Sequence, residues 1–171
     1  MRALLIFFVE LCALRRAPQD LPASAILLWL MLFADLFAGL LVGMTAGISL
    51  WASLLQGIVE IALMLAALTV ALQLMKRPGR FLQAGTALLG SGALLGLLAL
   101  MPLSLHPTGS QETNLAALGA FLLLGLVIWG VVVTGHILRH TFGLTLGQGA
   151  AIAIAFEIAA ITLVTGLFGG A

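Results

Sequence analysis

Residues 25–44, AILLWLMLFADLFAGLLVGM, and residues 48–75, ISLWASLLQGIVEIALMLAALTVALQLM, are two long apolar stretches separated only by Thr-Ala-Gly. Each stretch is long enough to cross the hydrocarbon core of a bilayer, about 30 Å thick, as a helix. Because so short a connection folds the second helix back along the first, the sequence predicts a hairpin of two transmembrane helices.

Each arm of this hairpin carries one acidic residue near its middle. Asp35 precedes the turn and Glu60 follows it by similar numbers of residues. At a rise of about 1.5 Å per residue, both carboxyl groups are expected at one depth, near the bilayer midplane. An ionised carboxylate there costs about 2.5–3.5 kcal/mol on insertion scales, so each acid needs a proton, a shared proton or water.

The composition places the whole chain in lipid. Hydrophobic residues make up 63% of the 171 residues and charged residues only 8%. A water-soluble domain of this size could not bury so much apolar surface. There is no strongly basic or acidic domain, so nucleic acid is not expected as a partner. The single cysteine, Cys12, cannot form an internal disulfide and is expected to be a buried, inert thiol.

The first 22 residues are expected to form an interfacial helix and a linker. Residues 1–14 are apolar but too few to cross the bilayer. Arg15 and Arg16 follow this stretch, where they can meet lipid headgroups, and Pro18 stops the helix. A cleaved signal peptide is not expected, because positive charge after the apolar run opposes export.

The rest of the chain, residues 23–171, is predicted to be one transmembrane domain and an all-α helical bundle. The third span is expected to stop near Pro102, and the polar stretch SLHPTGSQETN at residues 104–114 to form a loop. The five predicted spans are residues 23–44, 48–74, 81–103, 115–138 and 149–167.

The distribution of cations predicts the orientation. All seven Lys and Arg lie before the first span, between the second and third, or between the fourth and fifth. The positive-inside bias therefore predicts a cytoplasmic N-terminus and an outside C-terminus in a plasma membrane, most simply the bacterial inner membrane. The seven residues are Arg2, Arg15, Arg16, Lys76, Arg77, Arg80 and Arg139.

A row of glycines in the first span predicts a helix-packing seam. Gly39, Gly43 and Gly47 follow one another at intervals of four, a doubled small-xxx-small pattern that lets a neighbouring backbone approach closely. Asp35 extends this row by one turn, with a drift of about 40° per step. Asp35 is therefore expected to face a helix and not lipid.

Five polar residues form the candidate functional cluster: Asp35, Glu60, Gln56, Glu157 and His136. One interpretation is a path for protons or cations through the membrane. The other is that protonated acids and Gln56 make hydrogen bonds between helices and hold the bundle together. The sequence alone is compatible with both interpretations of the cluster.

Neither a metal or cofactor site nor an enzyme is predicted. His136 and His140 are spaced by four residues, as in some metal sites, but the sequence offers no third ligand nearby. No phosphate-binding loop, nucleophile elbow or zinc spacing occurs.

The last two predicted spans, IWGVVVTGHILRHTFGLTLGQGAAIAIAFEIAAI at residues 128–161, resemble the C-terminal part of the Yip1 domain family. The stretch FLQAGTALLGSGALLGLLALMPL at residues 81–103 is similar to that family's middle span. The resemblance covers about residues 23–169 and implies a five-span bundle with a cytoplasmic N-terminus. Eukaryotic members are associated with vesicle trafficking and small GTPase partners. The long cytoplasmic N-terminal region of those members is missing from this sequence. The resemblance carries over no site residue.

Two functions are compatible with these features. The first is a non-enzymatic, Yip1-like adaptor or assembly factor, whose partners are the lipid bilayer and other membrane proteins or further copies of the chain. The alternative is a proton- or cation-linked transporter or channel subunit that uses the mid-membrane carboxylates.

Overall fold

A computed structural model describes residues 2–105 and 114–168, and this part of the chain is helical without a strand. Five of the helices are long and apolar enough to cross a membrane, which confirms the predicted all-α bundle of an integral membrane protein. Most of the predicted loop at residues 104–114 lies outside the described residues. The helices are α1 (Arg2–Cys12), α2 (Ala25–Thr45), α3 (Leu50–Leu74), α4 (Phe81–Ser104), α5 (Asn114–Phe142) and α6 (Leu146–Phe168), with short 3-10 turns η1 (Pro18–Asp20) and η2 (Pro78–Arg80).

The α2–α3 hairpin is set by local capping. Ser49 begins α3 by accepting a hydrogen bond on its Oγ from the backbone N–H of Ala52, at 3.3 Å. Gly47 lies in the turn with a φ of 83°, a backbone conformation that favours glycine. The predicted hairpin is therefore present, and Gly47 forms part of the turn between its two helices.

Three helix ends differ from the predicted spans. Pro102 lies inside the last turn of α4, which continues to Ser104. The α5 helix runs on past residue 138 to Phe142, where Gly143 adopts a φ of 75°. Thr145 and Gln148 form a reciprocal cap, each side chain accepting a hydrogen bond from the other's backbone N–H, so that α6 begins at Leu146.

The most deeply buried span is α4. Of its apolar window, 39% of the residues are buried, against 11–17% in the other four spans. Its most extensive contacts are with α2, and they exceed those between α2 and α3. Small residues permit this close approach: a Cβ at Gly85 would lie only 3.1 Å from the Leu28 side chain of α2. The bundle is thus assembled around α4.

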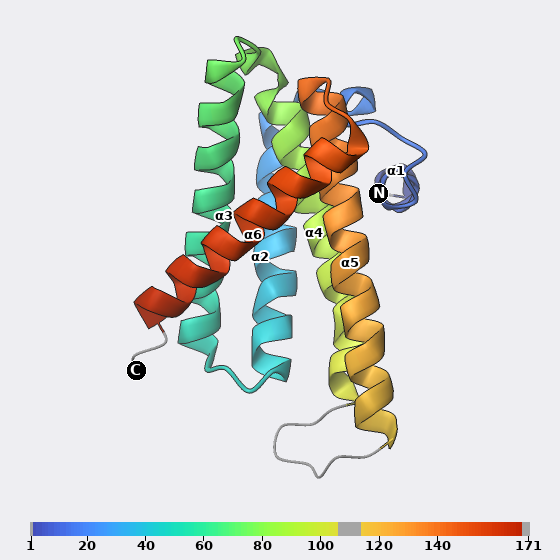
Figure 1. The fold of residues 1–171 in the computed structure, drawn as a ribbon, viewed down its shortest axis with the longest axis vertical. Coiled ribbons are helices and arrows are strands. Elements are labelled where there is room, and N and C mark those ends of the chain that lie inside the picture. The colour runs from blue at the N-terminus through green and yellow to red at the C-terminus, as the bar shows by residue number, and fades with distance from the viewer. Residues whose placement is uncertain (1, 106–113, 169–171) are drawn as a thin grey trace.

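The last helix, α6, runs diagonally across the other spans (Figure 1). It starts beside the end of α5, where Gly149 of α6 packs against the backbone of Gly135. A Cβ at Gly135 would lie 2.7 Å from the backbone nitrogen of Ala150. These glycines let two backbones meet, which fixes the crossing point of the two helices.

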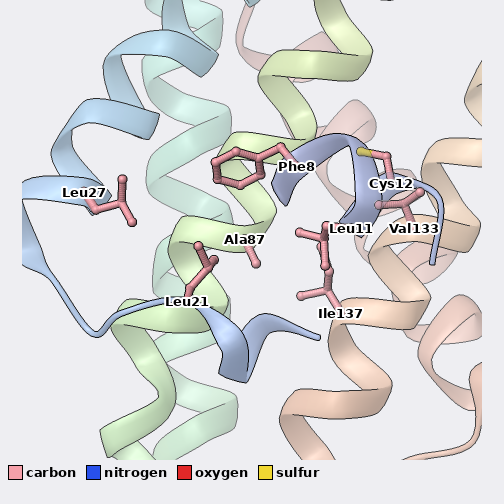
Figure 2. Close-up of a cluster of buried hydrophobic side chains, with 8 residues drawn as sticks. All are labelled: Phe8, Leu11, Cys12, Leu21, Leu27, Ala87, Val133 and Ile137. Atoms are coloured by element: carbon pink, nitrogen blue, oxygen red, sulfur yellow. The ribbon is translucent and has the colours of Figure 1, made fainter. Parts of the chain in front are cut away.

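The short helix α1 packs on the side of the bundle (Figures 1 and 2). Phe8 occupies the space left by the missing side chain of Gly90 on α4. Leu5 and Val9 of α1 are 64% and 55% exposed, so this helix leaves an apolar face for lipid. Figure 2 shows the cluster that buries α1: Phe8, Leu11, Cys12, Leu21, Leu27, Ala87, Val133 and Ile137.

Polar side chains of α4 and α5 bind the backbone of the segment that follows α1. Trp129 Nε1 donates a hydrogen bond to the carbonyl of Cys12 at 3.1 Å, and Gln83 Nε2 donates to that of Leu21 at 2.7 Å. His136 Nε2 lies 2.9 Å from the carbonyl oxygen of Arg16. These contacts satisfy carbonyls that regular structure leaves unpaired and hold the segment in place.

Candidate functional site

A cavity of about 670 Å³, partly open to the surroundings, lies between the membrane-spanning helices and has walls from all five spans, α2 to α6. Asp35 of α2, Glu60 of α3 and Glu157 of α6 all line it. The structure thus brings the three mid-span acids, which are far apart in the sequence, to one site.

The remainder of the cavity wall is almost entirely apolar. Ser91 and Thr134 are its other polar lining residues, and the Ser91 hydroxyl already donates to the carbonyl of Leu88 at 3.0 Å. Among the described residues, no Lys, Arg or His lines the cavity. Asp35 is partly buried, whereas Glu60 and Glu157 are exposed on the described chain. The three acids therefore border an apolar space in which the described residues place no cation to neutralise them.

Asp35 is positioned by Gly92 of α4. A Cβ built on Gly92 would lie 2.6 Å from Asp35 Oδ1, so the carboxylate occupies space that only glycine leaves open. Asp35 is partly buried and faces a helix, as its place in the glycine row predicts. The facing helix is α4, however, and not the hairpin partner α3.

Glu60 connects the main cavity to a second, smaller one. It lies within electrostatic range of both Asp35 and Glu157. It also lines a void of about 130 Å³ between α3 and α6, together with residues such as Val164 and Thr165. Glu60 and Ile161 are therefore lining residues of both cavities.

The predicted glycine seam is correct at one position only. Gly43 packs directly on Ser53, and a Cβ at Gly43 would lie 2.8 Å from Ser53 Cβ. The prediction is wrong for Gly39, which has no heavy atom within 4 Å of a Cβ built there and instead lines the cavity. Gly47 lies in the turn. A row of four-residue steps drifts by about 40° per step, so only one of its members faces α3.

Two predicted members of the polar cluster are not in it. Gln56 lines neither cavity. His136 lies at the segment after α1, with its ring 4.5 Å from that of His140 and its Nε2 against the carbonyl of Arg16. Over residues 2–105 and 114–168, no group of three His, Cys, Asp or Glu side chains is arranged to hold a metal ion.

Residues outside the predicted polar cluster complete the site. Gly92 leaves room for the side chain of Asp35, and Ser91 and Thr134 line the cavity wall. The interval from Gly92 to Gly96 is itself a small-xxx-small pattern, a signal that could have marked α4 as the helix approached most closely.

The fold and the cavity define a polytopic helical integral membrane protein with an acid-lined cavity within its spanning region. Comparisons with protein-family models, curated proteins and solved structures find no match for this chain.

Proposed function

We propose that this protein is a non-enzymatic, proton- or cation-linked membrane transporter or channel subunit. The observation that carries the proposal is the convergence of Asp35, Glu60 and Glu157 on one cavity. Carboxylates within a membrane that line a cavity commonly form binding sites or relays for protons and cations.

The hydrogen bonding of these acids favours transport over a purely structural role. In the described part of the chain, none of the three carboxylates makes a hydrogen bond or an ion pair with another residue. Acids retained only to hold helices together would be expected to bond across them. Three carboxylates without protein partners are instead available to a mobile proton or cation.

The arrangement of the basic residues supports a cytoplasmic N-terminus and an outside C-terminus in a bacterial inner membrane. The segment before α2, the α3–α4 turn and the α5–α6 turn lie toward one end of the bundle (Figure 1). These connections carry most of the Lys and Arg, including Arg16, Lys76 and Arg80. Cations gathered on one side are typical of the cytoplasmic face.

Flux measurements in proteoliposomes test the proposal. The wild-type protein should carry a flux driven by a pH gradient, and Glu60→Gln should abolish it. The matched control is Glu10→Gln, because Glu10 lies on α1 and pairs with Arg16 away from the cavity. A folded wild-type protein that carries no flux at any pH would refute the proposal.

A second candidate, a Yip1-like adaptor or assembly factor, is favoured by a different observation. The five spans agree in number with the architecture that the family resemblance implies, and α6 exposes apolar side chains outside the cavity, with Leu163 and Leu167 43% and 63% exposed. Copurification from native membranes tests this role. A stoichiometric protein partner that is released by substitutions on this face of α6 would support it.

A further inference from the structure

Resting on the proposed function, we infer that the cavity binds a hydrophobic organic cation, one whose charge is surrounded by hydrocarbon, and that Glu60 and Asp35 supply the attraction. The volume of about 670 Å³ falls within the range of about 300–1,000 Å³ that is usual for sites of drug-sized ligands.

The cavity lining matches both properties of such a ligand, its hydrocarbon surface and its positive charge. Apolar side chains from five helices, such as Met64, Leu95 and Phe156, can contact a hydrocarbon surface. The acids provide negative charge, with no cation of the described protein in the wall to compete for it. An organic anion would meet only repulsion here, and a neutral apolar molecule would leave the carboxylates without a counter-charge.

The geometry argues against a metal ion as the occupant. Metal cations such as Ca²⁺ and Mg²⁺ require about six or more oxygen ligands at distances near 2.0–2.6 Å. Over the described residues, no three carboxylates or other ligating side chains come together closely enough to hold one. Acids spread around a wide apolar space suit a large cation, which is attracted over a longer distance and is inexpensive to desolvate.

The second cavity indicates the route of entry. Glu60 lines both spaces, and the smaller one lies between α3 and α6. The diagonal course of α6 limits its contact with α3 (Figure 1). A hydrophobic cation dissolved in the bilayer could therefore pass between α3 and α6 and meet Glu60 first.

Equilibrium dialysis with two matched ions tests the inference. Tetraphenylphosphonium and tetraphenylborate have the same shape and opposite charge. The full chain in detergent should bind the cation saturably at about pH 8 and should not bind the anion, with detergent alone subtracted. Binding should weaken as the pH falls, because protons compete for the carboxylates.

Substitutions locate the site. Glu60→Gln should weaken tetraphenylphosphonium binding by about tenfold or more, because one of the charges that attract the cation is lost. Asp35→Asn is the second variant, and Glu10→Gln should bind like the wild type. Gel filtration and unfolding temperature check that each variant is folded. Equal binding of both ions, or unchanged binding in both Glu60→Gln and Asp35→Asn, would overturn the inference.

Different experimental results would refute the transporter proposal and the organic-cation site. Proton flux without tetraphenylphosphonium binding would refute the organic-cation site and leave the transporter standing. Charge-selective binding without flux of any kind would support the site and contradict transport.

Discussion

The carboxylate of Asp35 on α2 occupies the space that Gly92 on α4 leaves open, with a Cβ at residue 92 falling 2.6 Å from Asp35 Oδ1. This relationship joins the most extensive helix contact of the fold to the acid-lined cavity. The packing of α2 on α4 and the position of one cavity acid therefore depend on the same pair.

Gly92→Ala should displace the Asp35 carboxylate and destabilise the protein by about 1 kcal/mol, at the low end of the cost of overpacking, because the clashing atom ends a side chain that can move. Unfolding in detergent measures this effect. Gly125→Ala is the matched control, since a Cβ at that helical glycine meets nothing within 4 Å. Combining Gly92→Ala with Asp35→Ala should restore much of the loss, because the clashing atoms are gone. Additive losses in the double variant would show that the two residues do not interact.

Gly43→Leu should weaken the contact between α2 and α3, because the added side chain would overlap Ser53. Disulfide crosslinking between cysteines engineered on the two helices measures this contact. Gly39→Leu should leave crosslinking intact, since that position has open space. Equal loss in both variants would contradict the assignment of Gly43 as the packing position.

Gly135→Leu should move α6 away from α5 and carry Glu157 out of the cavity, because backbone atoms of Ala150 lie within 3 Å of a Cβ at residue 135. Proton flux should fall although Glu157 itself is unchanged. Gly147→Leu, in the first turn of α6, has room for its side chain and should retain flux. Full activity of Gly135→Leu would show that the crossing does not position Glu157.

Phe8→Ala should release α1 from the bundle. The side chain is 5% exposed and fills the space at Gly90, and removal of a buried Phe costs about 3–5 kcal/mol. Faster proteolysis between α1 and α2 would report the release. Leu5→Ala on the exposed face of α1 should change the cleavage rate little.

The thiol of Cys12 should be unreactive in the folded protein. Burial raises its pKa from 9.0 to about 11, so the folded thiol stays protonated when an unfolded one ionises. Native protein at about pH 8 should react slowly with maleimide, and protein unfolded in SDS rapidly. Fast labelling of the folded protein would contradict this burial.

The raised pKa of Cys12 also makes the free energy of unfolding depend on pH. Below pH 9.0 the thiol is protonated in both states, and its contribution is fully present. As the pH rises toward about 11, only the unfolded state loses the proton, so stability should fall over this interval. Cys12→Ala should reduce that fall, which denaturation at a series of pH values would detect.

The sequence alone determined the solvent, the class and most of the helices. Long apolar stretches can be stable only in lipid, and backbone hydrogen bonding within the bilayer requires each of them to be helical. The common level of Asp35 and Glu60 along the hairpin was also predictable, because it follows from the number of residues between each acid and the turn, and both acids line one cavity.

Only the tertiary structure decided which faces of the helices contact one another. Spacing placed Asp35 in a glycine row but could not show that Asp35 faces α4, or that Gly39 opens onto a cavity. Likewise, the residues around Glu157 in the sequence do not indicate that α6 crosses the bundle diagonally. That course follows from the contact between Gly135 and Gly149. Helix depth is a local property of the chain, whereas helix rotation and partner choice depend on packing between residues that are distant in sequence.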